Sequence, residues 1–292
     1  MTVDVEPEPC SPAAVIAPER YSRAADAVRS AGALIVTAGA GMGVDSGLPD
    51  FRGPQGFWKA YPMYERLGIT FVDAANPASF EREPAFGWGF YGHRAAMYRE
   101  TVPHRGFRIL LDWAERLHLR CFVVTSNVDG QFQKAGFSED QVLEVHGSIH
   151  YLQCMGPCRG AIWEDRTPVE IDLATMRARR IPRCPACGDV ARPNILMFGD
   201  DGWISYRTDQ QRHRFEAFLQ DCGEAKLAVV ELGAGTAVPT IRFTTERLAL
   251  IPGATAIRVN PLEPGIDPPH LSFGGGALEV LDGIDRALPT LP

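Results

Sequence analysis

Residues 39–53 read GAGMGVDSGLPDFRG and directly follow the apolar run Ala33-Leu34-Ile35-Val36, which predicts a buried strand. Glycines at four of its positions let the backbone turn sharply and approach a ligand closely: Gly39, Gly41, Gly43 and Gly47. A glycine-rich turn that leads from a strand into a helix points backbone N–H groups at an anion, usually a phosphate. Val44 stands where the common dinucleotide fingerprint has its third glycine, so the match to that fingerprint is partial.

The rest of the chain predicts an α/β fold. Further apolar runs indicate strands at 121–125, 142–145, 227–232 and 255–259, and helical patterns lie around them, among them 18–31, 105–118 and 210–222. Strands that alternate with helices imply an open, mostly parallel sheet with helices on both faces, and ligands bind such sheets at the carboxyl ends of the strands. Three segments directly follow predicted strands, so we expect them along one edge of one crevice: 39–52, 127–129 and 233–236.

Residues 53–104 interrupt this alternation and are rich in aromatic side chains. We interpret this segment as a helical flap inserted after the first strand, with most of its aromatic residues forming a small core.

Two close cysteine pairs, Cys154-x-x-x-Cys158 and Cys184-x-x-Cys187, predict a metal site. Two such pairs on two turns can offer four thiolates in tetrahedral geometry, which suits zinc. Because cysteines fill all four positions, the zinc would be structural and would leave no place for a catalytic water. The alternative interpretation is four free thiols.

Composition restricts the class of protein. The net charge of −7 argues against a dedicated nucleic-acid binder, which would carry a basic stripe. No apolar run approaches the roughly 20 residues that a membrane helix needs. Residues 1–17 are acidic and proline-rich at their start, lack the pattern of a secretory signal and indicate a loose tail. These two features lead us to expect a cytoplasmic protein. The seven cysteines, four of them clustered, agree with this expectation, because in a cytosolic chain they favour metal binding over disulfides. Cys121 is expected to be a small buried hydrophobic residue.

Three later segments carry a family resemblance: TSNVD at 125–129, EVHGS at 144–148 and RPNILMFGD at 192–200. In this order, with the cysteine pairs before the last, the chain closely resembles the sirtuin (Sir2) family of NAD-dependent protein deacylases from about residue 25 to 285. The resemblance implies a Rossmann-like NAD-binding domain made of 18–150 and 192–292, with the flap at about 53–104. It also implies a small inserted zinc-binding module at 151–191.

The resemblance further implies an NAD site and its catalytic residues. His146 would be the general base, because an imidazole can take a proton from a ribose hydroxyl near working pH. Asn127 and Asp129 would act with it in the nicotinamide pocket. The residues implied to bind NAD are Gly39, Ala40, Gly41, Asp50, Phe51, Arg52, Ser126, Asn127, Asp129, Gly233, Gly235, Thr236 and Asn260.

Two further segments would bind the acylated-lysine protein substrate. Phe198-Gly199-Asp200 stands where the family has Phe-Gly-Glu, which pairs with the substrate backbone as an added strand. Tyr91 and Arg94 form a Tyr-x-x-Arg pair on one face of a helix, as in sirtuins that remove succinyl, malonyl or glutaryl groups. An arginine can bind the distal carboxylate of such an acyl group in a bidentate manner.

The chain also departs from the family pattern. Ser126 replaces the usual glutamine, Gly43 the usual serine, and Gly233-Ala234-Gly235-Thr236 the usual Gly-Thr-Ser, which indicates a divergent bacterial-type branch. The leading hypothesis is an NAD-dependent lysine deacylase that releases nicotinamide and O-acyl-ADP-ribose. The alternative is a protein mono-ADP-ribosyltransferase or NAD glycohydrolase on the same scaffold. A third hypothesis is a non-enzymatic NAD-sensing or zinc-binding scaffold.

Overall fold

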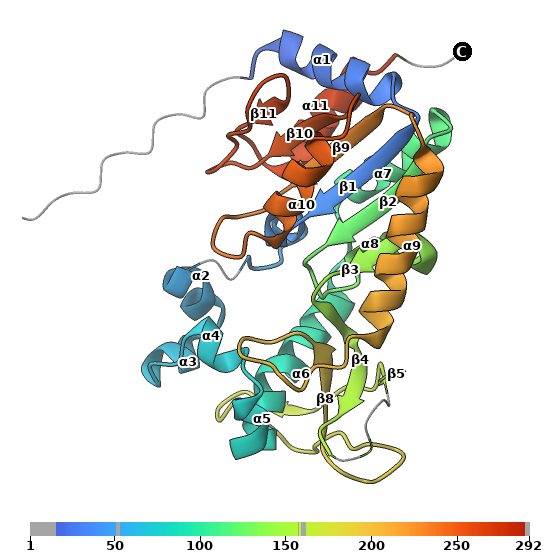
Figure 1. Ribbon diagram of the computed structural model, residues 1–292. Coiled ribbons are helices and arrows are strands. Elements are labelled where there is room, and N and C mark those ends of the chain that lie inside the picture. Colours follow the sequence, from blue (N-terminus) through green and yellow to red (C-terminus); the bar gives the residue numbers. More distant parts are fainter. Residues whose placement is uncertain (1–15, 51–52, 157, 159–161, 290–292) are drawn as a thin grey trace, which may run out of the picture.

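The computed structural model describes residues 16–50, 53–156, 158 and 162–289. Figure 1 shows two parts, a large sheet with its helices and a smaller part built of the flap helices and short strands. Among the described residues, no helix combines the length and the apolar character that crossing a membrane requires. Phe51 and Arg52, which the family resemblance implies to bind NAD, lie outside the described residues.

The large sheet has six strands, all parallel, in the order β11-β10-β9-β1-β2-β3. This is a doubly wound order, in which β2 and β3 follow on one side of β1, and β9, β10 and β11 follow on its other side. Such sheets bind ligands where the direction of strand addition reverses, which is between β1 and β9. The bounds of the strands are β1 Ala33–Ala38, β2 Arg120–Thr125, β3 Val142–Glu144, β9 Leu227–Leu232, β10 Thr255–Val259 and β11 Leu271–Phe273. The predicted parallel α/β fold is therefore confirmed.

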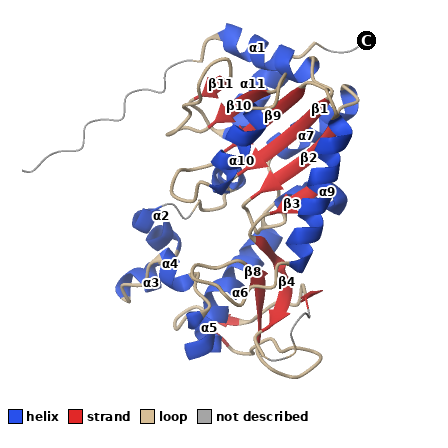
Figure 2. Ribbon diagram, viewed as in Figure 1, coloured by secondary structure: helices blue, strands red, loops and turns tan. Residues whose placement is uncertain are grey.

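Helices cover both faces of the large sheet (Figure 2). Side chains that alternate along β1 point to opposite faces, so that Leu34 and Val36 join one core cluster and Ala33 and Ile35 join another. The first face is covered by α1 (Pro18–Arg29), α7 (Arg105–Arg116) and α11 (Ala277–Ala287), and the second by α9 (Tyr206–Cys222) and α10 (Thr240–Ala249). Cys121 is buried in the first core, as predicted.

The glycine-rich turn after β1 differs from the expectation in one detail. It leads into a 3₁₀ helix, η1 (Ala40–Ser46), rather than an α-helix, and this helix ends at Gly47 in the left-handed conformation, with φ of 84°. Two further short helices, α8 (Gln131–Ala135) and the 3₁₀ helix η2 (Glu139–Gln141), lie between β2 and β3 in the chain.

The flap is helical, as predicted. Its helices are α2 (Gly53–Ala60), α3 (Pro62–Arg66), α4 (Phe71–Ala74), α5 (Ala78–Arg82) and α6 (Pro84–Glu100). The aromatic core extends beyond the flap, because Phe57 and Tyr64 belong to the same cluster as Leu152, Met176 and Ile195. A Cβ at Gly89 on α6 would lie 1.8 Å from the carbonyl oxygen of Met176, so this glycine permits close contact between the flap and the cysteine-bearing segment.

The described residues between Gly147 and Ile195 form two small antiparallel sheets. One is formed by β5 (Ile162–Glu164), β4 (Gly147–Cys154) and β8 (Ala191–Ile195), and the other by β6 (Ile171–Asp172) and β7 (Arg177–Ala178). β4 begins directly after His146, so the small sheet continues from the edge of the large sheet at the predicted catalytic residue.

Candidate active site and metal site

One cavity of about 760 Å³ lies at the carboxyl ends of β1, β2, β3, β9 and β10, between the large sheet and the flap. Its volume is in the range of cofactor and ligand sites. The structure brings together here most of the residues predicted for catalysis and binding: Gly39, Ala40, Asp50, Tyr91, Arg94, Ser126, Asn127, Asp129, His146, Phe198, Gly235 and Thr236.

Five of the described residues predicted to bind NAD or substrate are absent from the cavity wall: Gly41, Gly233, Asn260, Gly199 and Asp200. The first two of them hold the glycine turns together. Gly41 donates its backbone N–H to the carbonyl oxygen of Gly233 at 3.0 Å. A Cβ on Gly41 would lie 2.7 Å from the Cα of Gly233, and one on Gly233 would lie 2.4 Å from Gly41. These glycines therefore allow two backbone turns to meet, while Ala40 and Gly235 beside them line the cavity.

Asn260 is the third of these residues and is completely buried. Its side-chain amide donates to the carbonyl oxygen of Ala234 at 2.8 Å, and its Oδ1 accepts the backbone N–H groups of Leu262 at 2.9 Å and Glu263 at 3.0 Å. Asn260 therefore fixes the loops after β9 and β10 from behind the cavity wall.

Thr236 faces a residue that the sequence analysis did not identify. Its backbone N–H and its hydroxyl donate to the two carboxylate oxygens of Glu263, at 3.1 Å and 2.6 Å. Glu263 also lines the cavity, and its carbonyl oxygen accepts a hydrogen bond from the buried Arg242. No local sequence signal predicts this pairing, because the two residues lie on loops after different strands.

His146 follows β3 and lines the cavity. Burial lowers the pKa of His146 from its ordinary value, and a hydrogen bond with the backbone of Ser126 opposes that shift. The imidazole is therefore neutral near pH 7, which is the form that can accept a proton. His150 lies outside the cavity wall, and its Nε2 is 3.0 Å from the carbonyl oxygen of Asp129.

Asn127 and Asp129 occupy the turn after β2. The Asn127 amide donates to the carbonyl oxygen of Gly39 at 3.0 Å, which joins this turn to the glycine-rich turn after β1. The Asp129 carboxylate is buried and accepts the backbone N–H of Gln131 at 2.9 Å. Burial raises the pKa of Asp129 to about 6, although this hydrogen bond works in the opposite direction.

Tyr91 and Arg94 lie on α6, and both are buried at the cavity wall. Four aromatic rings surround the Arg94 guanidinium, with centroids 5.0 to 6.0 Å from its central carbon: Phe71, Phe90, Tyr91 and Tyr98. The guanidinium also donates two hydrogen bonds to the Tyr98 hydroxyl. Rings that surround a buried cation stabilise it through their negative faces.

The three residues of the Phe198-Gly199-Asp200 segment differ in whether they line the cavity. Phe198 is partly exposed at the cavity wall, whereas Gly199 and Asp200 do not line it. Asp200 pairs with Arg192 at 2.7 and 2.8 Å, and both side chains are buried. The structure thus gives Asp200 an internal partner within the substrate-binding segment.

Several cavity residues were missed by the sequence analysis. They come from the start of α4, from the end of β8 and from the loops after β9 and β10: Thr70, Phe71, Val72, Ala75, Ile195, Leu196, Met197, Val238, Leu262 and Glu263. Tyr98 is also among the lining residues. A signal for it existed, because Tyr91, Arg94 and Tyr98 have the spacing of one helix face.

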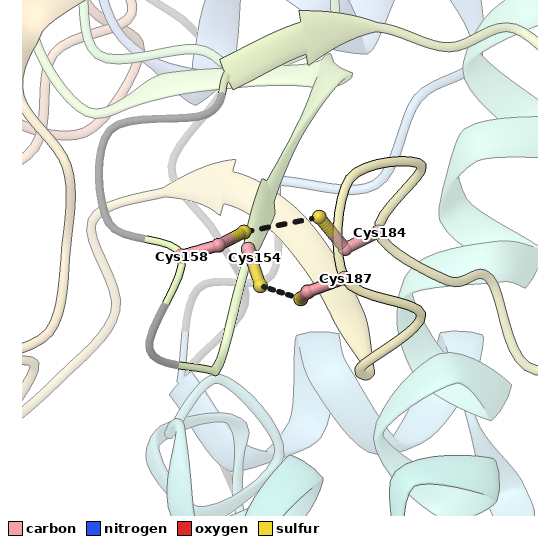
Figure 3. Close-up of side chains that lie close together, drawn as sticks. All are labelled: Cys154, Cys158, Cys184 and Cys187. Carbon is pink, nitrogen blue, oxygen red and sulfur yellow. Dashed lines mark hydrogen bonds between the residues drawn. The ribbon is translucent and has the colours of Figure 1, made fainter.

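The four predicted cysteine ligands form a single cluster, in which all sulfur atoms lie within 4.8 Å of one another (Figure 3). The sulfurs of Cys154 and Cys187 are 3.5 Å apart, and those of Cys158 and Cys184 are 3.2 Å apart. Sulfurs bound tetrahedrally to zinc at about 2.3 Å would be separated by roughly 3.8 Å. The cluster therefore fits a structural zinc ion held by four thiolates.

Comparisons with known proteins agree with this geometry. The model of the Sir2 family matches residues 39–237. An NAD-dependent protein deacylase 1 of Pseudomonas aeruginosa is 32% identical over 229 residues, which is 78% of this chain and 82% of that protein. An NAD-dependent protein deacylase of Thermus thermophilus is 29% identical over 282 residues, which is 94% of this chain and 96% of that protein.

Solved structures show the same fold. A Sir2 homologue in complex with NAD has a TM-score of 0.68 at 23% identity, and the match covers 91% of this chain and 93% of that one. A Sir2 protein with a deacetylated peptide and an acetylated ADP-ribose has a TM-score of 0.60 at 21% identity, over 90% and 96% of the two chains. From the family match, the relatives and the fold together, we conclude that this chain belongs to the Sir2 family.

Proposed function

We propose that this chain removes acyl groups from lysine side chains of proteins, with NAD as its co-substrate, and forms nicotinamide and O-acyl-ADP-ribose. The observation that carries the proposal is the gathering of His146, Asn127 and Asp129 beside the glycine-rich turn, in one cavity of a Sir2-family chain. The relatives are named as deacylases and deacetylases, which does not favour the ADP-ribosyltransferase alternative.

The described residues fit NAD. The two glycine turns meet backbone to backbone at Gly41 and Gly233, so that Ala40 and Gly235 form a wall without bulky side chains. Such a wall suits the close approach of a diphosphate. We propose that Ala40, Gly235 and Thr236 hold the phosphates and the adenosine side, while Asp50, Ser126, Asn127 and Asp129 hold the nicotinamide side. Gly39 would line the site beside Ala40, whereas Gly41, Gly233 and Asn260 would support these loops from behind. Phe51 and Arg52 would close the site as the resemblance implies.

His146 is the proposed general base. When NAD is bound, it supplies an electrophilic ribose carbon and a leaving group, and the proton to be removed is on a ribose hydroxyl. The neutral His146 imidazole faces the cavity and can accept that proton.

Asn127 and Asp129 are proposed to position the nicotinamide group. Asn127 ties its turn to Gly39, so both sides of the pocket are fixed relative to each other. The buried Asp129 carboxylate can accept a hydrogen bond from an amide. Enclosure by the flap would keep out water, which otherwise hydrolyses NAD without transferring the acyl group.

The substrate peptide is proposed to lie along residues 196–198, where Leu196 and Phe198 are 39% and 36% exposed. The backbone N–H groups of Leu196, Met197 and Phe198 already donate within the chain, to His146, Asp200 and Ala75. The backbone of an added substrate strand would therefore donate hydrogen bonds to the carbonyl oxygens of residues 196–198. Val238, 44% exposed at the cavity wall, offers apolar contact to residues beside the acyl-lysine.

We further propose that the preferred acyl groups carry a negative charge, as succinyl, malonyl and glutaryl groups do. The support is the position of Tyr91 and Arg94 at the wall of the same cavity as His146. A guanidinium can bind a carboxylate with two parallel hydrogen bonds, and a phenol can add another.

Mass spectrometry of purified protein with NAD and a panel of acyl-lysine peptides tests both proposals. We expect NAD-dependent loss of the acyl group, equimolar nicotinamide and O-acyl-ADP-ribose, and a higher kcat/KM for succinyl-lysine than for acetyl-lysine. ADP-ribose attached to protein, or free ADP-ribose without deacylated peptide, would instead establish the alternative chemistry. In Arg94→Met, the preference for succinyl-lysine should disappear while acetyl-lysine is still turned over.

For the chain as a whole, we propose a division into an NAD-binding domain of residues 18–150 and 192–292 and a zinc-binding module of residues 151–191. We also propose a cytoplasmic location, because the clustered cysteines suit thiolate ligands, which persist in reducing compartments.

A further inference from the structure

Tyr91, Arg94 and Tyr98 occupy one face of α6, at spacings of three and four residues, and all three line the cavity. Each is almost completely buried, with exposed fractions of 1%, 7% and 5%. The Tyr-x-x-Arg pair is therefore extended by one helical turn into a group of three polar side chains in an aromatic wall.

The Tyr98 hydroxyl is the point to which Arg94 is anchored. Arg94 donates from Nε at 3.0 Å and from Nη2 at 2.6 Å, so one edge of the guanidinium is directed at a single phenol oxygen. These two contacts fix the rotation of the guanidinium plane. Orientation matters here, because a planar guanidinium recognises a carboxylate only when the two planes match.

The phenol hydrogen remains available for a further bond. Burial raises the pKa of Tyr98, so the hydroxyl keeps its proton at working pH. Its oxygen accepts both bonds from Arg94, and none of the described residues accepts a hydrogen bond from this hydroxyl. A phenol polarised by two bonds from a cation is a stronger donor than an isolated one.

Tyr98 is also fixed through its backbone. The Gln131 side chain donates to the Tyr98 carbonyl oxygen at 2.9 Å, and the Gln131 backbone N–H donates to the Asp129 carboxylate at 2.9 Å. Gln131 is 1% exposed. The end of α6 is thereby connected to the turn that carries Asp129. Gln131 therefore links the proposed acyl-binding residues on α6 to the proposed nicotinamide-binding residue Asp129.

We propose that Tyr98 is a third specificity-determining residue of the acyl site. It positions the Arg94 guanidinium and donates its own hydroxyl hydrogen to the distal carboxylate of an acidic acyl group. The inference rests on the proposed acidic-acyl deacylase function and assigns to Tyr98 a role that the Tyr-x-x-Arg pattern does not include.

The test is a double-mutant cycle of Tyr98→Phe and Arg94→Met, measured on succinyl-lysine and acetyl-lysine peptides of the same sequence. Tyr98→Phe should lower kcat/KM for succinyl-lysine about tenfold, mainly by raising KM, because one hydrogen bond to a charged group and the anchoring of Arg94 are lost. The loss for acetyl-lysine should be smaller, so that the ratio of the two kcat/KM values falls. In the Arg94→Met background, adding Tyr98→Phe should have little further effect, because the two side chains act together.

Tyr64→Phe is the matched control. The Tyr64 hydroxyl is buried in the same aromatic cluster, has no hydrogen-bond partner among the described residues, and does not line the cavity. Its removal should leave both substrates unaffected. Equal melting temperatures and zinc contents of all variants would separate specificity from folding.

The outcomes distinguish the two proposals. If the unmodified protein does not prefer succinyl-lysine, the acidic-acyl function and the role of Tyr98 both fail. If it prefers succinyl-lysine and Tyr98→Phe retains that preference, only the role of Tyr98 is overturned. Should Tyr98→Phe fold poorly, a crystal structure of the unmodified protein with a succinyl-lysine peptide decides: the carboxylate must lie within hydrogen-bond distance of the Tyr98 hydroxyl, and a longer separation rejects the proposal.

Discussion

Asp200 and Arg192 form a buried ion pair in which two guanidinium nitrogens contact two carboxylate oxygens, at 2.7 and 2.8 Å. The side chains of Arg192 and Asp200 are 3% and 0% exposed. The same carboxylate accepts the backbone N–H groups of Met197 and Gly202, so one side chain holds both ends of the turn after β8. We therefore propose that Asp200 shapes the segment that presents Phe198 and acts on the substrate only through it.

The first prediction concerns this pair. Asp200→Asn should lower the free energy of unfolding by about 3 kcal/mol, because it leaves the buried Arg192 cation without its counter-charge. Differential scanning calorimetry of the zinc-loaded protein measures the change. Glu83→Gln is a suitable control, because it breaks an ion pair with Arg177 whose side chains are 47% and 43% exposed, and should cost less than about 1 kcal/mol. An Asp200→Asn protein of unchanged stability with a raised peptide KM would show instead that Asp200 contacts the substrate.

The second prediction concerns His146. His146→Ala should abolish deacylation while the fold and the zinc content are retained, because only the group that accepts a ribose proton is removed. Release of nicotinamide and of acyl-ADP-ribose should be followed separately, since His146 is assigned to a step after NAD binding. His213→Ala, at an exposed position on α9, should behave as the unmodified protein. Full deacylase activity in a folded His146→Ala variant would remove this residue from the mechanism.

The third prediction concerns the buried carboxylate of Asp129. Its folded-state pKa of about 6 exceeds the ordinary value of 3.8, so the folded protein binds this proton more tightly than the unfolded chain. The contribution of this group to stability is therefore highest below pH 4 and falls as the pH rises through about 6. Asp129→Asn should raise the melting temperature at pH 8, by an amount equivalent to at most roughly 3 kcal/mol, and less at pH 5.

The same substitution should abolish turnover, because the proposed nicotinamide contact is lost. Asp201→Asn, at an exposed position, should leave the melting temperature nearly unchanged at both pH values. A stabilising effect of Asp129→Asn that is equally large at pH 5 and pH 8 would argue against a buried, titrating carboxylate.

The fourth prediction concerns the cysteine cluster. Freshly purified protein should contain one zinc ion per chain, and Cys184→Ser should lower both the zinc content and the melting temperature, because metal binding contributes folding energy to such modules. Cys121→Ala, in the core of the large sheet, should keep its zinc. Elemental analysis that finds no zinc in protein prepared without chelators would refute the assignment.

The class of fold and the position of the cavity follow from the amino-acid sequence alone. Strands such as 33–38 and 227–232 consist mostly of apolar residues because both faces of a parallel sheet are buried, and such segments can be recognised locally. Several of the segments that line the cavity follow these strands directly, and parallel strands end at one edge, so the meeting of those segments could be predicted. The cysteine spacing was likewise sufficient, because ligand pairs lie close together in the chain.

Only the tertiary structure decided what individual polar side chains contact. β11 has three residues and is stabilised by pairing with β10 rather than by a local pattern. The pairing of Thr236 with Glu263 joins loops far apart in the sequence, and the burial of Asp200 against Arg192 depends on the turn that brings them together. Residue identity indicates that a carboxylate or a guanidinium is present. Its partner is set by which segments pack around it, and that depends on contacts between residues distant in the chain.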